Sequence, residues 1–347
     1  MIELTMLPGK DGDCLLLSYG DGTFERRVLV DGGRASSYDQ VKPVLASLEP
    51  AHLDLLVVTH VDQDHVLGVL KLLEDEDHVG VGEVWFNGYD HLKDVALETF
   101  GAKDGELLTT KLLEQHIPWN AAFEGRAIEH GRTPAGFDDG ARFHVVAPDR
   151  VLLEQLVAVW EEECRKHGLI PGVEAQAPPA IEGFEQLGAL DIEKLAATPF
   201  DPDESKPNAS SIAFLFEYDG VRILFTGDGD DRRMVESLKP LAEAEGGRVH
   251  LDALKVSHHG SAGNLSRELL ELIDCPRYLI STNGARHGHP DAVAMARILK
   301  YGGDSKELVF NYRERATDWD LPEWKEKYGY TVTVPPGDQD GRVTLAW

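Results

Sequence analysis

The sequence predicts an α+β fold in which two mixed β-sheets are flanked by helices. Short β-prone segments open the chain, and strands then alternate with helices in both halves of the sequence. Polar clusters rich in histidine and aspartate follow several of the apolar segments. Because a sheet brings the ends of its strands to a common edge, this pattern favours a layered sandwich with one site at that edge.

The first third of the chain contains short strands bounded by turn residues. Some of its apolar segments have the length and spacing typical of strands, and others have the spacing typical of helices. The elements predicted here are strands at 2–6, 14–19 and 26–30, a helix near 38–48, a strand at 53–59, a helix at 66–74 and a strand at 82–88.

The segment from roughly 89 to 206 is less regular, and we interpret it as an insertion or cap within a single domain spanning 1–347. It holds helix-like segments at 105–116 and 149–168 around a strand at 141–148. Strand patterning resumes at 210–218 and 221–228, and the Asp-Gly pair between these runs predicts a hairpin. The elements predicted after it are a helix at 231–244, a strand at 251–259, a helix near 266–273, a strand at 277–282, a helix at 291–302 and a hairpin of 330–336 with 342–347.

The composition is that of a globular protein with an unusual charge. Lys and Arg number 34 and Asp and Glu number 61, for a formal net charge of -27. Such a surface repels DNA, which argues against a broad non-specific nucleic-acid binder, although bound cations can reverse the field locally. Cys14, Cys164 and Cys275 form no CxxC pair and predict free thiols in a reducing compartment. We find no signal peptide or membrane-spanning run and expect a cytoplasmic protein without membrane contact.

The segment THVDQDH, residues 59–65, holds four potential metal ligands. Residues two apart in an extended segment point the same way, so His60 and Asp62 can converge. Asp64 and His65 stand where a strand gives way to a helix. Imidazole and carboxylate together suit zinc, manganese or iron. The alternative is an acidic loop without metal, since an acidic chain produces such pairs by chance.

Three further polar clusters follow apolar strands. They contain Asp228 in TGDGDD, His258 and His259 in KVSHHGS, and His287 with His289 in NGARHGHP. Each alone is as consistent with a turn aspartate or a buried histidine as with a ligand. Their shared position after strands predicts that they meet in space.

The order of these motifs resembles that of the metallo-β-lactamase superfamily. The segments that carry the resemblance are VLVDGG at 28–33, HVDQDH at 60–65, NASS at 208–211, TGD at 226–228, KVSHHGS at 255–261 and GHP at 288–290. More narrowly, the chain is similar to the metallohydrolase (nuclease) domain of ComEC-type DNA-uptake proteins, in a standalone soluble form. The resemblance implies a four-layer αβ/βα sandwich with a dinuclear metal site, and it covers most of the chain outside roughly 89–206.

The resemblance implies two divalent metal ions, Zn²⁺ or Mn²⁺, as cofactors. The implied metal ligands are His60, Asp62, Asp64, His65, Asp228 and His258. Asp64 and His65 would hold one ion, with His258 completing its ligand set. His259 is the alternative to His258, which we favour.

The second ion is expected at His60 and Asp62, with Asp228 bridging both ions. The commoner superfamily motif has histidine at the position of Asp62, and a carboxylate there makes manganese more plausible beside zinc. A further histidine ligand often found before the bridging aspartate has no convincing counterpart. Asp31 is expected to orient a ligand histidine through a hydrogen bond.

The implied activity is hydrolysis by a metal-bridging hydroxide. The expected catalytic residues are Asp62, Asp64, Asp228 and His259. Asn208, Ser261 and His289 are expected to bind substrate, by holding phosphate oxygens or protonating the leaving group. Ordinary hydrogen bonding within loops is the alternative for these three.

The leading hypothesis is a metal-dependent phosphodiesterase or nuclease acting on DNA, RNA or a nucleotide. One alternative is a hydrolase of small phosphoesters, lactones or thioesters, because one fold serves many chemistries. Another is a catalytically weak binding module in a larger assembly. The net charge predicts a nucleic-acid substrate that is short, single-stranded or taken at an end, or one that a partner protein delivers.

Overall fold

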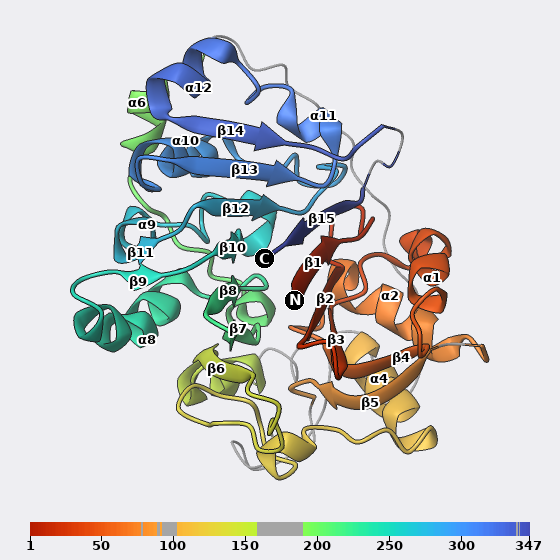
Figure 1. Cartoon of the computed structure of the whole chain (residues 1–347). Coiled ribbons are helices and arrows are strands. Elements are labelled where there is room, and N and C mark those ends of the chain that lie inside the picture. The colour runs from red at the N-terminus through yellow and green to blue at the C-terminus, as the bar shows by residue number, and fades with distance from the viewer. Residues whose placement is uncertain (78, 89–90, 92–102, 158–189, 338, 340) are drawn as a thin grey trace.

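The computed structural model describes residues 1–77, 79–88, 91, 103–157, 190–337, 339 and 341–347. Within these ranges the strands form two large sheets and one small one. Helices lie on the outer side of each large sheet (Figure 1).

The N-terminal half supplies most of a six-stranded sheet. Its strands, in spatial order, are β15 (Val343–Ala346), β1 (Ile2–Met6), β2 (Leu15–Gly20), β3 (Glu25–Val30), β4 (His52–Val57) and β5 (Gly80–Trp85). The first four pair antiparallel, whereas β3, β4 and β5 are parallel to one another. Parallel pairing puts the ends of β3 and β4 at the same edge, where the chain continues into Asp31 and His60.

The C-terminal half builds a seven-stranded sheet. Its strands, in spatial order, are β14 (Tyr330–Thr333), β13 (Lys306–Phe310), β12 (Arg277–Ile280), β10 (Ala253–Lys255), β8 (Val221–Phe225), β7 (Ala213–Tyr218) and β6 (Arg142–Ala147). The five strands from β14 to β8 are parallel, and β7 and β6 continue the sheet antiparallel. Asp228 therefore follows β8 at the same edge at which His258 follows β10. The short strands β9 (Val249–His250) and β11 (Ile273–Asp274) form the third sheet.

The helices divide into two groups, one for each large sheet (Figure 1). On the side of the six-stranded sheet lie α1 (Tyr38–Ala46), α2 (Gln63–Glu74) and α4 (Lys103–Glu114). On the side of the seven-stranded sheet lie α6 (Ile192–Ala196), α8 (Asp231–Ala244), α9 (Arg267–Leu272) and α10 (Ala292–Tyr301). Short helical segments are η1 (Ala35–Ser37), η2 (Ala121–Phe123), α7 (Lys206–Ala209), η3 (Ser257–Gly260), α11 (Arg313–Ala316) and α12 (Pro322–Tyr328). Within the described ranges, no helix combines the length and apolar character needed to span a bilayer.

Three buried apolar clusters hold the layers together. One lies between the two large sheets and includes Leu17, Leu55 and Phe225. The other two lie between each sheet and its helices, with Val69 of α2 in one and Leu238 of α8 in the other. Apolar packing on both faces of both sheets confirms the predicted αβ/βα sandwich of two mixed sheets flanked by helices.

The hairpin predicted at the Asp-Gly pair is confirmed. β7 and β8 pair antiparallel, with Tyr218 opposite Val221. Asp219 and Gly220 between them both have positive φ, at 48° and 82°. Two such residues twist the turn in the sense that matches the right-handed twist of the strands.

The predicted C-terminal hairpin is wrong. β14 pairs with β13 in the seven-stranded sheet, whereas β15 pairs with β1 in the other sheet, with Val343 opposite Met6. The Gly-rich turn between them carries the chain from one sheet to the other. The composition of a turn does not determine which strands pair. In addition, the sequence analysis predicts no strand at the position of β13, which is the partner of β14.

The segment from roughly 89 to 206 contributes to the sandwich itself. β6 lies within it and forms the edge of the seven-stranded sheet, and α4 packs against α2. Residues 92–102 and 158–189 lie outside the described residues, as do Cys164 and the second half of the helix predicted at 149–168. That this segment is an insertion or cap within a single domain stays a prediction.

Candidate metal centre

The site lies where β3, β4, β8, β10 and β12 end. Each predicted polar cluster follows one of these strands directly. Long-range contacts between the clusters, described below, show that segments as distant as 31–65 and 228–289 meet here. The predicted convergence of the clusters is confirmed.

Asp31 and Thr59 fix the first two histidines. The backbone N–H and the hydroxyl of Thr59 each donate to Asp31, both at 2.8 Å. His65 donates from Nδ1 to the same carboxylate at 2.8 Å. Because the Thr59 hydroxyl gives its only hydrogen to Asp31, it accepts from Nδ1 of His60 at 3.1 Å. Both rings therefore carry hydrogen on Nδ1 and present Nε2 to the interior of the site.

The second pair of histidines belongs to η3. His258 and His259 both have positive φ, 47° and 54°, so the chain turns sharply at these residues. His259 donates from Nδ1 to the carbonyl oxygen of Ser281 at 2.9 Å, and His258 donates from Nδ1 to Oδ1 of Asn264 at 2.9 Å. These rings also present Nε2 to the site.

One carboxylate oxygen, Oδ2 of Asp228, faces all four histidines. Its distances to their Nε2 atoms are 3.8 Å for His60, 3.4 Å for His65, 3.6 Å for His258 and 3.8 Å for His259. The Asp228 side chain is 3% exposed. The Asp228 backbone N–H donates to the Ser211 hydroxyl at 3.2 Å, which anchors the residue at the end of β8.

This arrangement leaves buried polar atoms without partners. Among the described residues, Nε2 of His60, His65 and His259 and Oδ1 of Asp228 make no hydrogen bond. Orphaned atoms of this kind are rare in a folded interior and call for a specific explanation. Two donors bound to one tetrahedral ion at about 2.1 Å lie roughly 3.4 Å apart, close to the distances found here. The residues therefore fit divalent metal ions.

The charges of the site support the same conclusion. Burial favours the neutral form of Asp228, but His258, His65 and His259 outweigh it and lower the pKa of its carboxyl group. Burial opposes protonation of His259, yet Asp228 and Asp13 raise its pKa to about 10. His60 differs, because burial and the neighbouring His65 lower its pKa to about 4. Metal ions would displace protons from such histidines, since only the unprotonated nitrogen binds metal.

The aspartates of the first motif occupy the opening of the site. Asp62 is the N-cap residue of α2, but its side chain makes no capping hydrogen bond. Its carboxylate lies 3.8 Å from Nε2 of His60 and is 43% exposed. Surrounding protein and the negative charge of Asp64 and Asp228 raise its pKa to about 6. Asp64 lies 3.6 Å from Nε2 of His259 and 3.8 Å from Arg34.

The geometry bears on the expected choice between the tandem histidines, which stays a prediction. Potential ligand atoms of Asp64, His65 and His259 lie within 4.8 Å of one another, as do those of His60, His65 and Asp228. His258 is in neither group, and its side chain is 20% exposed, against 2% for that of His259. The geometry thus favours His259, not His258, as the partner of Asp64 and His65. The two consecutive left-handed residues turn the rings to different sides, which the sequence does not reveal.

The predicted substrate-binding residues surround His258. Nδ2 of Asn208 lies 3.4 Å from Nδ1 of His258, and the backbone N–H of Ser261 donates to the His258 carbonyl at 2.9 Å. The ring of His289 is 5.3 Å from that of His258, and its Nδ1 lies 3.1 Å from Asp291. Ser261 and His289 lie at the rim of the site beside its more exposed histidine, and Asn208 is buried next to that histidine.

Several residues of the site were missed in the sequence. Asp13 lies 3.3 Å from Nδ1 of His259, and Asp203 lies 3.3 Å from Nδ1 of His258. Asn264 and Thr59 orient rings as described above. Asp13 carried a weak signal, because it stands directly before an apolar strand. The other clusters follow their strands, whereas Asp13 precedes one. The pattern of polar clusters after strands therefore did not include it.

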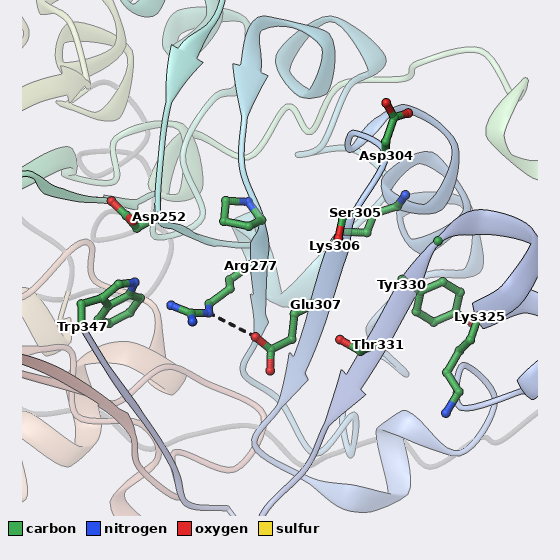
Figure 2. A pocket seen from close by; sticks show the side chains of 12 residues that line it. Asp252, Arg277, Asp304, Ser305, Lys306, Glu307, Lys325, Tyr330, Thr331 and Trp347 are labelled. Atoms are coloured by element: carbon green, nitrogen blue, oxygen red, sulfur yellow. Dashed lines mark hydrogen bonds and ion pairs between the residues drawn. The ribbon is translucent and has the colours of Figure 1, made fainter.

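A separate pocket of about 610 Å³ lies at the opposite end of the strands. Figure 2 shows Arg277, at the start of β12, beside Glu307 and Trp347. Two of its cationic side chains have partners: Arg277 pairs with Glu307 at 3.1 Å, and Lys306 donates to the carbonyls of Gly303 and Tyr328. None of the predicted site residues lines this pocket.

Comparison with known proteins agrees with this architecture. Residues 9–173 match the model of the metallo-beta-lactamase superfamily. ComE operon protein 3 of Bacillus subtilis (strain 168) is 26% identical over 126 residues, which are 35% of this chain and 16% of that protein. The chain thus spans only a small part of that relative.

Two solved structures align with most or all of the chain at low similarity. The metallo-beta-lactamase fold protein YhfI from Bacillus subtilis is 10% identical, with 99% of each chain covered and a TM-score of 0.42. A variant of CmlA beta-hydroxylase is 13% identical over 100% of this chain and 54% of its own, with a TM-score of 0.41. Residues 9–173, a little under half of the chain, are thus similar to the metallo-beta-lactamase superfamily, and the described strands form the two-sheet sandwich.

Proposed function

We propose that the protein is a metal-dependent hydrolase of phosphodiester bonds. The observation that carries the proposal is the set of four imidazole Nε2 atoms around the buried Asp228 carboxylate, three of them without partners in the described chain. A purely structural cluster of this kind would leave polar atoms unsatisfied at a cost that folding does not ordinarily tolerate.

Two divalent ions, Zn²⁺ or Mn²⁺, would be held by separate groups of side chains. Asp64, His65 and His259 would bind one ion. His60 and Asp62 would bind the other. Asp228 would contact both ions, and His258 faces the same Asp228 oxygen from the more exposed side. When bound, such ions supply Lewis-acid activation of water and of the scissile ester.

The residues of the rim are suited to a phosphoester. Asp291 lies at Nδ1 of His289, which leaves Nε2 of that ring free to donate to a phosphate oxygen or to the leaving group. Oδ1 of Asn208 has no partner among the described residues, and the Ser261 side chain is partly exposed. The resemblance of HHGS and GHP to ComEC-type metallohydrolase motifs favours phosphodiester over lactam or lactone substrates.

The substrate is proposed to be a nucleotide or a short or single-stranded nucleic acid, or a strand end. At a net charge of -27, the protein offers little to the many phosphates of a long duplex. Close to the site, Arg286 is exposed near His289 and adds a positive charge to the rim, whereas burial and the neighbouring His289 lower the pKa of His287. A partner protein that delivers the substrate is an extension of this proposal.

Metal content and a substrate panel test the proposal. Reconstituted protein should hold close to two transition-metal ions per chain by elemental analysis. It should then hydrolyse a bis(nitrophenyl) phosphate faster than a phosphomonoester, a lactone or a β-lactam. Asp228→Asn should abolish this activity, with Asp230→Asn as a matched control on the same loop. Absence of bound metal under every loading condition would refute the metal site, and faster lactone or lactam turnover would favour the small-ester alternative.

Binding to nucleic acid is tested separately. Labelled duplex and single strands should be titrated across a salt series, first in EDTA and then with Mn²⁺. We expect weak duplex binding in EDTA and a shallow salt dependence with metal. Tight, steeply salt-dependent duplex binding in EDTA would reveal a basic surface and contradict the proposed substrate class.

A further inference from the structure

Asp13 and Lys255 form a fully buried ion pair beneath the site. Lys255 Nζ lies 2.7 Å from Oδ2 of Asp13, and both side chains are at most 2% exposed. Asp13 lies in the turn between β1 and β2, whereas Lys255 ends β10. The pair thus joins the two large sheets at the edge that carries the metal ligands.

Burial of such a pair calls for a reason other than stability. Removing two charges from water is costly, and well-packed apolar side chains of similar volume stabilise a core as well or better. Lys255 makes one further hydrogen bond, from Nζ to the carbonyl of Val256 at 2.8 Å. The ion pair with Lys255 occupies only Oδ2 of Asp13, so a second contact of this carboxylate involves Oδ1.

That second oxygen faces a proposed metal ligand. Oδ1 of Asp13 lies 3.3 Å from Nδ1 of His259, and within the described chain it makes no hydrogen bond. On the far side of the ring, Nε2 lies 3.6 Å from Asp64 and 3.8 Å from Asp228. The carboxylate and the proposed metal ion therefore stand at opposite nitrogens of one imidazole.

A buried carboxylate also lies at Nδ1 of His65, where it accepts a hydrogen bond. Asp31 contacts Nδ1 of His65 at 2.8 Å, and Nε2 of His65 faces Asp228 at 3.4 Å. His258 differs, because its Nδ1 contacts Asn264 and Asp203 at the rim and not a carboxylate of the interior. The two histidines grouped with Asp64 are thus the two backed by buried carboxylates.

The carbonyl of Ser281 already orients the ring of His259 through a hydrogen bond at 2.9 Å. A carbonyl fixes the tautomer but carries no net charge. A carboxylate at the same nitrogen adds negative charge, which makes Nε2 a stronger donor to a cation. Lys255 keeps this carboxylate in place, and its own charge discourages a cation from binding directly to Asp13.

We propose that Asp13, held by Lys255, is a positioning residue that strengthens His259 as a metal ligand without binding the metal itself. The inference rests on the proposed metal function of the site. It adds Asp13 and Lys255 to the residues on which that function depends.

The test replaces the pair as a unit. Asp13→Asn alone leaves a buried lysine without its charged partner, which is strongly destabilising by itself. The double variant Asp13→Leu/Lys255→Met removes both charges and keeps the volume apolar, so it should fold. Asp231→Asn is the matched control, because Asp231 is also a buried carboxylate, but it accepts from the backbone N–H of Ser266 and touches none of the proposed ligands.

Metal affinity and the cobalt spectrum are the readouts. By chelator competition, the double variant should bind metal roughly 10- to 100-fold more weakly than wild type, with the same stoichiometry. Its Co²⁺ complex should show shifted visible bands, whereas Asp231→Asn should match wild type in both measurements. Urea unfolding in EDTA confirms that each variant is folded.

The outcomes separate the inference from the proposed function. Wild-type affinity and an unchanged cobalt spectrum in a folded double variant would overturn the role of Asp13 and leave the metal site intact. Loss of one ion per chain at saturation would show that Asp13 is itself a ligand, which also overturns the positioning role. Wild-type protein that binds no metal would remove the proposed function together with the inference.

Discussion

Replacement of Gly68 by alanine should connect the packing of α2 directly to the metal site. The helix carries His65 one turn before Gly68 and crosses the loop that carries Asp31. Gly32 N–H donates to the His65 carbonyl at 2.9 Å, and Gly68 N–H donates to the Gly33 carbonyl at 2.8 Å. A Cβ atom on Gly68 would lie 1.8 Å from the Gly32 carbonyl oxygen.

The size of the effect follows from that distance. The contact must lengthen from 1.8 Å to at least 3.0 Å, and both atoms belong to backbone rather than to flexible side chains. A shift of α2 in this direction separates His65 from Asp31, whose 2.8 Å hydrogen bond cannot survive it. Overpacking of this kind costs about 1–3 kcal/mol, and a buried backbone clash lies at the upper end. The better helix propensity of alanine offsets about 1 kcal/mol.

We therefore expect Gly68→Ala to lower the free energy of unfolding by about 2 kcal/mol. Metal affinity should fall roughly 10-fold or more, because the carboxylate that supports His65 moves away. Urea unfolding in EDTA and chelator competition measure the two effects. Lys71→Ala, on the exposed side of the same helix, is the control and should change stability by no more than about 0.5 kcal/mol. A Gly68→Ala protein as stable and as metal-avid as wild type would show that α2 does not hold the two residues together.

Three further predictions concern ligands, metal and pH. His259→Ala should lose one bound ion per chain, whereas His258→Ala should keep both ions with weaker affinity. Elemental analysis measures the ion content, and the reverse pattern would favour His258 as the ligand. Zinc at about 100 times its dissociation constant should stabilise the wild type by about 2.7 kcal/mol in urea unfolding. Asp228→Asn should abolish most of this stabilisation. An equal stabilisation of the variant by zinc would exclude Asp228 as a ligand. Burial raises the pKa of Asp231 to about 6, so its protonated form favours the native state and this contribution is lost as pH rises from about 4 to above 6. In EDTA, Asp231→Asn should therefore gain up to about 3 kcal/mol relative to wild type across this range, and a difference that does not vary with pH would contradict the raised pKa.

The sequence by itself determined the elements and the place of the site. Apolar periodicity is a local property, so the helices now seen as α1, α2, α8 and α10 and most strands followed from it. The clusters at 60–65, 228 and 258–259 were placed correctly at one edge because the ends of parallel strands share an edge. The link of Asp31 to a ligand histidine came from the motif resemblance.

Tertiary structure alone decided which distant segments meet. β14 and β15 are close in sequence, yet their partners β13 and β1 lie in different sheets. Strand pairing is set by burial against distant segments, which the local turn does not encode.

The different burial of His258 and His259 was decided in the same way. Both are histidines in one turn, and the two positive φ angles of η3 bury one ring and expose the other. Asp13 became part of the site only because the fold brings it to Lys255 and His259, far along the chain, where the two sheets meet. Local patterns specify which face of an element is buried, whereas the chemical neighbours of a buried charge depend on how whole layers pack.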